Sequence, residues 1–299
     1  MSVNPFALRG RDHPAGHLSP FPGKGSEESG LYVDVGGASA RFARFTEEFT
    51  PPDAAAGRGR LVVVTGDSGS GKTSLVDRCV DWLGRAAAER GWQAPAVDLR
   101  EAEAVALGTA DRVRLVFRRL VASLAEEGAV PRRWVEELRV HEDDPPSGYR
   151  ALGRVVLEQR RFAVVLLPSC ELPMELREYA RLATPGVVLF LESSYPEVER
   201  EAESPPSEGR VLHLRMGRLG ADDVRRFVEQ RLRGRPPGTV PEISDEAMEA
   251  VVRTAPHLAT VRQVQMLLHE MFDRAIAESR TTVTYRDFLE YWNAKDLTR

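Results

Sequence analysis

Short runs of consecutive apolar residues alternate with segments of helical spacing along the first 217 residues of the chain. The runs are almost wholly apolar, which is typical of strands buried on both faces. They are Leu61–Thr65, Ala96–Leu99, Phe162–Leu167, Val187–Leu191 and Val211–Leu214. Because helical patterns separate them, we expect an α/β fold: a parallel sheet of about five strands, covered on both faces in three layers. Leu31–Val35 is a further candidate for a short strand.

The pattern changes near residue 218, where strand signals stop. Four segments then have apolar residues at helical spacing: Ala221–Leu232, Asp245–Arg253, Val261–Glu278 and Tyr285–Trp292. The residues before Leu31 are rich in Gly, Pro, Ser and His and have little apolar periodicity, which favours an extended segment. We therefore expect a flexible leader at 1–30, an α/β domain at 31–217 and an all-helical domain at 218–299.

The composition argues against membrane-spanning and disulfide-rich proteins. The chain is 42% hydrophobic and 29% charged, and no apolar run approaches the roughly 20 residues of a membrane-spanning helix. Two cysteines, Cys79 and Cys170, are too few for a disulfide framework. We therefore expect a cytoplasmic protein with no membrane partner.

The charge balance gives no support for a nucleic-acid-binding protein. The formal net charge is −4, so no global positive field attracts phosphates. Basic residues are almost all arginine, and the abundance of Arg, Ala, Gly and Pro is typical of GC-rich coding. Only three of 41 basic residues are lysine: Lys24, Lys72 and Lys295. A lysine at a chemically meaningful position is therefore informative.

Lys72 lies in the strongest motif of the chain, G-x-x-x-x-G-K-[ST], at positions 66–73. The glycines let backbone N–H groups curl around phosphate oxygens, and the following helix points its positive end at the same anion. Lys72 would contact the β- and γ-phosphates, and the Thr73 hydroxyl would bind Mg²⁺. The residues expected to hold the nucleotide here are Gly66, Asp67, Ser68, Gly69, Ser70, Gly71, Lys72, Thr73 and Ser74.

The second acidic motif of P-loop proteins is out of register. Such proteins place an acid at the end of another buried strand, where it holds Mg²⁺ through water. Here the strand Phe162–Leu167 is followed by Pro168 and Ser169, and the first acid, Glu171, comes two to three residues late. Glu171 is either the compensating catalytic acid or the start of the next helix, where an acid suits the dipole. Because losing one preorganised group costs about 100- to 1,000-fold in rate, slow or absent hydrolysis is expected.

The strand Val187–Leu191 is followed by Glu192, Ser193 and Ser194. If this strand lies between the P-loop strand and the Phe162 strand, its tip faces the γ-phosphate. Ser193 or Ser194 would then orient the attacking water; the alternative is ordinary turn chemistry before Pro196.

With these landmarks the chain resembles the P-loop ATPases of the AAA+ and STAND type, including their replication-initiator branch. The resemblance covers roughly residues 31–295, and only its first landmark is highly specific. The landmarks are GDSGSGKTS at 66–74, FAVVLL at 162–167, VVLFLESS at 187–194, VLHLRMGRLGADDVRRFVEQRL at 211–232 and the helical lid at 243–272. It implies a five-stranded parallel sheet, a helical lid and a nucleotide, ATP with Mg²⁺, in the seam between them. No N-K-x-D stretch that would read guanine is present.

The resemblance also implies roles for individual residues. Arg262, at a lid helix start, would read the γ-phosphate, and Tyr32 and Arg41 precede the P-loop where such proteins cover adenine. Arg200 or Arg210 would be the arginine finger lent to a neighbouring subunit. Two departures remain: the acid is out of register, and the chain ends after the lid with no room for the DNA-binding module of initiators.

Three functions fit these observations. The first is an ATP-dependent switch or assembly ATPase with weak or absent hydrolysis, acting on a protein partner or by self-assembly. The second is an active AAA+ ATPase that remodels DNA or protein, which needs a catalytic Glu171 and an arginine finger. The third is a small-molecule kinase, against which the long helical tail argues. Nucleic acid stays open as a partner through the basic run that begins at Arg225 and Arg226, although a solvated lid helix explains that run better.

Overall fold

The computed structural model describes residues 4–7, 33–53, 57–101, 108–126, 128, 131–204, 209–233, 238–258 and 260–296. These residues form two compact units. The α/β unit contains residues 40–66 and 75–215, and the lid unit contains residues 67–74, residues from 216 onward and the described segments before residue 40. No helix of the described residues is long and apolar enough to cross a membrane.

A five-stranded sheet forms the centre of the α/β unit. Its strands are β1 (Arg60–Thr65), β2 (Ala96–Asp98), β3 (Ala163–Leu166), β4 (Val187–Ser193) and β5 (Val211–Arg215). The order is β2-β3-β4-β1-β5, and every pair is parallel. The continuous apolar runs therefore became buried parallel strands, which confirms the expected α/β fold.

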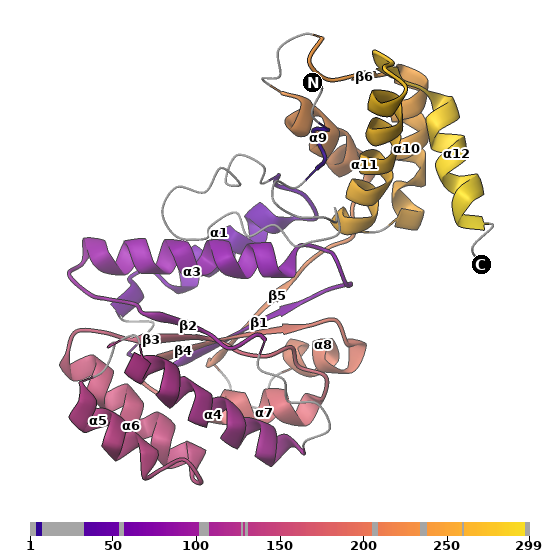
Figure 1. Ribbon diagram of the computed structural model, residues 1–299. Helices are drawn as coiled ribbons and strands as arrows, with labels where there is room; N and C mark the ends of the chain where they lie inside the picture. Colours follow the sequence, from indigo (N-terminus) through magenta and orange to yellow (C-terminus); the bar gives the residue numbers. More distant parts are fainter. Residues whose placement is uncertain are drawn as a thin grey trace. The chain divides into compact units, whose positions relative to one another are not determined.

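Helices cover both faces of this sheet (Figure 1). One face carries α1 (Ala38–Glu48) and α3 (Lys72–Glu89). The other carries α4 (Thr109–Glu126), α5 (Arg132–Arg139), α6 (Pro145–Glu158), α7 (Pro173–Leu182) and α8 (Pro196–Glu203). Side chains alternate between the two layers, because successive strand residues point to opposite faces.

On β4 the alternation is easy to follow. Leu189 and Leu191 belong to the core cluster that includes residues of α4, α6, α7 and α8. Phe190 points the other way and packs on Phe45 of α1, with ring centroids 5.9 Å apart. Phe45 in turn meets Trp82 of α3 edge-on. The α3 face of the sheet is therefore the face that carries Phe190.

Four helices make up most of the lid unit: α9 (Ala221–Leu232), α10 (Asp245–Leu258), α11 (Val261–Ala277) and α12 (Tyr285–Asp296). Between them, β6 (Glu242–Ile243) and β7 (Thr282–Val283) pair as a two-residue parallel ladder. Apart from this short ladder, the regular structure described after residue 220 is helical, as expected.

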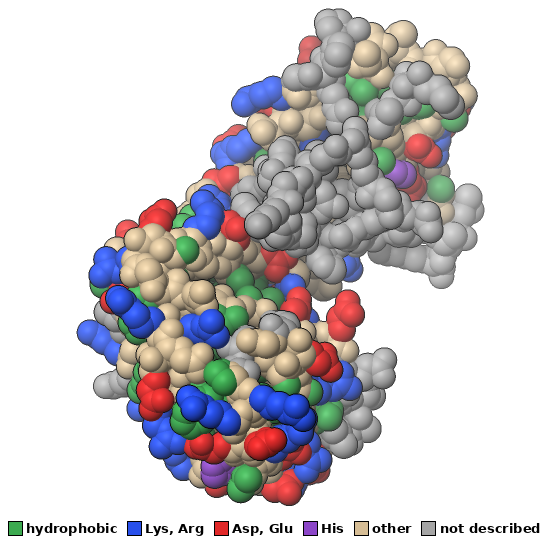
Figure 2. All heavy atoms as spheres, turned by 60° about the vertical axis from the view of Figure 1, so that its left-hand side comes forward, with side chains coloured by type: hydrophobic (Ala, Val, Ile, Leu, Met, Phe, Trp, Pro, Cys, Tyr) green, Lys and Arg blue, Asp and Glu red, His purple; other side chains and the backbone are tan. Residues whose placement is uncertain are grey.

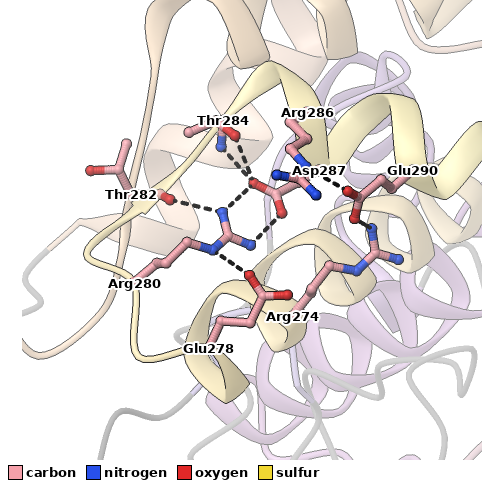
Figure 3. Close-up of polar contacts among 8 residues, drawn as sticks. All are labelled: Arg274, Glu278, Arg280, Thr282, Thr284, Arg286, Asp287 and Glu290. Carbon is pink, nitrogen blue, oxygen red and sulfur yellow. Dashed lines mark hydrogen bonds and ion pairs between the residues drawn. The ribbon is translucent and has the colours of Figure 1, made fainter.

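A polar cluster fixes the turn between α11 and α12 (Figure 3). Arg280 donates from Nη1 and Nη2 to the two carboxylate oxygens of Asp287, at 2.8 and 2.5 Å. Asp287 also accepts the backbone N–H of Thr284 at 2.8 Å, which satisfies a free donor at the start of α12. The Asp287 side chain is 1% exposed, so the ion pair is part of the lid interior.

The first described residues of the chain lie inside the lid core. Phe6 is fully buried and contacts Phe272 of α11 and Phe227 of α9, with ring centroids 4.9 and 6.1 Å away. Asn4 donates to the His269 carbonyl at 2.9 Å, and Gln265 donates to the Phe6 carbonyl at 3.3 Å. These residues belong to the segment expected as a flexible leader; its remainder, residues 1–3 and 8–30, lies outside the described residues.

Residues 33–35, the described part of the expected strand Leu31–Val35, form no strand. Val33 and Val35 are instead buried in the lid core. Asp34 accepts from Arg226 through its carbonyl at 2.9 Å and from the Ser39 N–H through its carboxylate at 2.7 Å. The apolar alternation that suggested a strand therefore belongs to an extended segment anchored in the lid.

Candidate functional site

The glycine-rich loop follows β1 directly and ends where α3 begins at Lys72. Gly66, Gly69 and Gly71 have φ values of 141°, 80° and 95°, a region that side chains with a Cβ rarely adopt. Lys72 is 8% exposed, and its Nζ donates to the Asp67 carbonyl at 3.0 Å. The Lys72 ammonium group is thus held close to the loop backbone, where a phosphate would also bind.

Gly69 meets the first turn of α11 within the lid unit. The backbone N–H of Arg262 donates to the Gly69 carbonyl at 3.2 Å, and a Cβ added at Gly69 would lie 2.7 Å from the Arg262 Cβ. Thr260 caps this helix by accepting the Gln263 N–H. Only glycine permits this approach, and it places the exposed Arg262 side chain next to the loop.

The loop residues fit a nucleoside triphosphate. Ser70 is 4% exposed, and its Oγ has no hydrogen-bond partner among the described residues, as expected for a group that bonds a ligand. Backbone N–H groups at the start of α3 and the Lys72 ammonium supply further anion contacts. Thr73 is the second residue of α3, where its hydroxyl suits a magnesium ligand. At the other end of the loop, Asp67 pairs with Arg218 at 3.0 Å.

The end of β3 offers no carboxylate in the strand register. The Leu167 N–H donates to the Phe190 carbonyl, and the Cys170 N–H donates to the Glu192 carbonyl. Between these two hydrogen bonds the β3 side advances by three residues, while β4 advances by two. This is a one-residue bulge at Pro168 and Ser169. Cys170 is buried and Glu171 is exposed. Glu171 therefore lies on the solvent side of the bulge.

Buried charges hold the bulge in place. Arg112 of α4 pairs with Glu175 of α7 at 3.0 Å and donates to the Ser169 carbonyl at 3.2 Å. Burial and the nearby Glu175 carboxylate raise the pKa of the Cys170 thiol to about 12. Cys170 is thus a neutral core residue under ordinary conditions.

The strand β4 lies between β1 and β3, which is the arrangement that the role of Ser193 and Ser194 required. Ser193 is fully buried; its Oγ donates to the Cys170 carbonyl at 2.7 Å and accepts the Tyr195 N–H at 3.2 Å. Ser194 is exposed. Of the two serines, Ser194 has the side chain that solvent reaches, and Ser193 ties β4 to the bulge.

The structure describes one of the two residues expected near adenine. Arg41 of α1 donates from Nε to the carbonyl of Arg215, at the end of β5, at 2.8 Å. Tyr32 lies outside the described residues. Of the arginine-finger candidates, Arg200 pairs with Glu197 on its own helix, and Arg210 donates to the Ala183 carbonyl.

Sequence reasoning missed a charged cluster at the carboxyl edge of the sheet. Arg100, just after β2, donates to Asp98 at 2.6 Å and to Asp77 of α3 at 2.9 Å, and it lies 3.8 Å from Glu192 of β4. Burial disfavours its charge, but the hydrogen bond that Arg100 donates to Asp98 and the surrounding carboxylates raise the pKa of Arg100 above its ordinary value. One arginine among many carried no signal in the sequence.

Opposite charges are mixed over the face of the α/β unit that Figure 2 shows. The ion pairs of the α/β unit include Arg154–Glu137 and Arg118–Asp143. In the basic run of α9, Arg225 pairs with Glu249, and Arg231 is buried over the Phe227 ring. Two arginines of the run are therefore engaged within the lid unit, whereas Arg233 is exposed.

Comparisons of sequence give no relative: no protein-family model and no curated protein matches the chain. Comparisons of structure give ORC proteins among the similar folds. The Aeropyrum pernix ORC1 protein in complex with DNA aligns with a TM-score of 0.58 and 16% identity, over 91% of this chain and 67% of that one. The Aeropyrum pernix ORC2 protein, solved as ADPNP-ADP complexes, aligns with a TM-score of 0.55 and 15% identity over 85% of this chain.

Drosophila ORC bound to DNA aligns with a TM-score of 0.55 and 15% identity over 88% of this chain. The chain spans 65% of the length of the ORC2 protein and 63% of the Drosophila chain. Sequence identities this low support a conclusion about the fold only. The chain therefore shares its overall fold with these ORC structures.

Proposed function

We propose that this chain is an ATP-binding switch or assembly ATPase of the AAA+/STAND kind, with weak or absent intrinsic hydrolysis. The observation that carries the proposal is the loop after β1, in which Gly69 meets Arg262 of α11 and Ser70 keeps a buried, unsatisfied hydroxyl. The loop is continuous with β1 and α3 and contacts α11, so phosphate binding there can act on the sheet and on the lid. Such coupling is what a nucleotide-dependent switch needs.

The phosphates would bring negative charge to the Lys72 ammonium group. Lys72 would then exchange its bond to the Asp67 carbonyl for a charge-assisted bond to phosphate oxygens. Thr73 would hold Mg²⁺ with its hydroxyl, and Arg262 would contact the γ-phosphate from the lid. Glu171, Ser193 and Ser194 are the residues proposed around the attacking water, and Tyr32 and Arg41 are the residues proposed to cover the adenine.

Weak hydrolysis follows from the end of β3. Pro168 cannot ligate a metal, and Ser169 is not a base at neutral pH. Glu171 is exposed beyond the bulge and must move to reach the loop. A protein or DNA partner, or a second copy of the chain, would therefore be needed for fast turnover. The initiator structures bound to DNA suggest DNA as one such partner, and self-assembly is the other.

The first experiment compares binding with turnover in the purified chain. Calorimetry should show Mg-ATP binding, and Lys72→Ala should weaken it by about 1.5–3 kcal/mol, the range of hydrogen bonds to charged groups. Steady-state turnover should stay well below the enzyme median of about 10 per second. Equal ATP affinity for the wild type and Lys72→Ala would refute nucleotide binding by this loop, and rapid turnover without a partner would favour the active remodelling ATPase.

The second experiment tests the lid. Arg262→Gln should reduce the preference for ATP over ADP and leave ADP affinity nearly unchanged, because only ATP carries the γ-phosphate. Arg253→Gln, on the neighbouring α10, is the matched control and should change neither affinity. An equal loss for both nucleotides would assign Arg262 a general phosphate contact and not the reading of the γ-phosphate.

A further inference from the structure

Arg100 gathers three carboxylates from separate elements of the α/β unit. Its partners are Asp98 next to it, Asp77 on α3 and Glu192 at the end of β4. The Asp77 and Glu192 side chains are 7% and 14% exposed. Largely buried carboxylates of this kind repel one another unless a cation lies among them. The Arg100 guanidinium is one such cation for all three carboxylates.

The direction of Glu192 follows from the alternation along β4. Phe190 packs on Phe45 on the α3 face, and Glu192, two residues later, shares that face. Ser193 shares the opposite face with Leu191 and bonds to the Cys170 carbonyl. The contact of Arg100 with both Asp77 and Glu192 agrees with this assignment. Glu192 thus points toward α3, the helix that begins with Lys72 and Thr73.

The height of Glu192 along the sheet is also fixed. Its Cα pairs with that of Val64, and Ser193 pairs with Thr65, the last residue before Gly66 and the loop. On α3, Asp77 follows Thr73 by four residues, so both lie on one face of the helix. Within the α/β unit, Glu192 therefore lies beside the end of β1, and Asp77 lies one turn after Thr73 on α3. Glu171, in contrast, is exposed beyond the bulge of β3.

We propose that Glu192 is the carboxylate of the nucleotide site, taking the place of the acid missing from β3, and that Arg100 holds it in check. This inference rests on the proposed function. In hydrolysis, the oxygen of a water molecule would form a bond to the terminal phosphorus of ATP while the bond from that phosphorus to the bridging oxygen breaks. ADP would leave with the electron pair, and Glu192 would accept the proton of the water and pass it to solvent.

The ion pair between Arg100 and Glu192 keeps Glu192 from accepting a proton while the protein is at rest. Glu192 must leave the guanidinium before it can take a proton from water. Asp77 and Asp98 keep Arg100 charged and in place at 2.9 and 2.6 Å. Slow turnover of the isolated chain then has two causes: no acid on β3, and an acid on β4 held by an ion pair. Arg100 is a positioning residue in this scheme, since it acts through Glu192.

The test uses the full chain, Mg-ATP and phosphate release under single-turnover conditions, with affinity measured by calorimetry. Glu192→Gln keeps the shape of the side chain and should lower the rate about 100-fold, as loss of a proton acceptor does, while the affinity stays within about 2-fold. Glu158→Gln, at an exposed position of α6, is the matched control and should stay within about 2-fold in both the rate and the affinity. A rate unchanged by Glu192→Gln, or lost in Glu171→Gln instead, would overturn the inference.

Loss of the ion pair between Arg100 and Glu192 should change the rate of phosphate release in the opposite direction. Arg100→Gln should raise the rate several-fold, Arg100→Lys should keep it low, and adding Glu192→Gln to Arg100→Gln should abolish the gain. If the wild type and Arg100→Gln both bind Mg-ATP and neither releases phosphate, the inference is wrong while the binding switch stands. If the wild type binds no Mg-ATP, the proposed function itself fails.

A readout independent of turnover is the coupling between the two side chains. In urea unfolding, Arg100→Gln should destabilise the wild type more than it destabilises Glu192→Gln, because the second background has already lost the ion pair. Strictly additive effects of the two substitutions on the free energy of unfolding would contradict the proposed ion pair between Arg100 and Glu192.

Discussion

The α/β unit and the lid unit build their cores from the chain in different ways. The core cluster of the α/β unit is drawn from residues 61–202, a single continuous stretch. The lid core combines residues after Leu219 with Phe6, Val33 and Val35, which lie more than 180 positions earlier. A unit of the first kind can form from its own segment, whereas the lid needs both parts of the chain. The expected division near residue 218 stays a prediction, and it omits these early anchors.

The largest test of this comparison removes the aromatic anchor. Phe6→Ala should destabilise the lid by about 3–5 kcal/mol, because it leaves a cavity between Phe227 and Phe272. Hydrogen exchange should then show lost protection in α11 and unchanged protection in β1 and β4. Phe49→Ala, which removes a fully buried ring of the α/β unit, is the matched control and should give the reverse pattern. Unchanged exchange in α11 would mean that the lid does not need its early anchor.

The second test uses pH to act on the lid alone. Burial opposes ionisation of Asp287, but hydrogen bonds from Arg280 and Thr284 hold the pKa of its carboxyl below its ordinary value. The unfolded chain therefore takes up a proton more readily, so this stabilisation is present above about pH 4 and is lost as the pH falls further.

Asp287→Asn should cost about 2 kcal/mol at neutral pH, as expected for hydrogen bonds to a charged group. It should also flatten the loss of stability between about pH 5 and about pH 3. Urea unfolding followed by a probe on α12 measures both effects. Parallel pH curves for the two proteins would contradict the assignment of this dependence to Asp287.

The smallest effect is expected within the α/β unit. Gly153 of α6 touches the segment before β4 so closely that an added Cβ would lie 2.0 Å from the Pro185 carbonyl oxygen. Gly153→Ala should cost about 1–3 kcal/mol, the usual penalty of overpacking. Gly84 of α3 has nothing within 4 Å of such a Cβ, and Gly84→Ala should stabilise by about 0.5–1 kcal/mol. Thermal unfolding that gives both variants the same sign would contradict this close packing of α6.

The strands were predictable because burial on both faces leaves a local signature. The run Val187–Leu191 became β4, which continues to Ser193 because its register with β1 extends to Thr65. The P-loop was predictable because phosphate binding constrains residue types at fixed spacing, and the helical lid because its periodicity is local. The fold therefore followed from short stretches of sequence.

The rest of the site depends on which strands become neighbours. Nothing local distinguishes Arg100 from the other arginines, since its role comes from β2, β4 and α3 meeting at one edge. The sequence places Glu192 next to two serines, and only strand alternation, which requires the bounds of β4, separates the face of Glu192 from that of Ser193. Phe6 gave no signal because a lone aromatic residue in a Gly- and Pro-rich segment has no periodicity.

The burial of both cysteines makes the chain a convenient starting point for spectroscopy. Cys79 is fully buried on α3, and burial raises the pKa of its thiol well above the ordinary value; Cys170 is buried and similarly shifted. Thiol reagents attack thiolates that solvent can reach, so neither native sulfur should react in the folded protein. One added cysteine on an exposed position of α12 and another on α5 would then accept a dye pair without removal of native residues, and energy transfer between the dyes would report the motion of the two units as nucleotide is added.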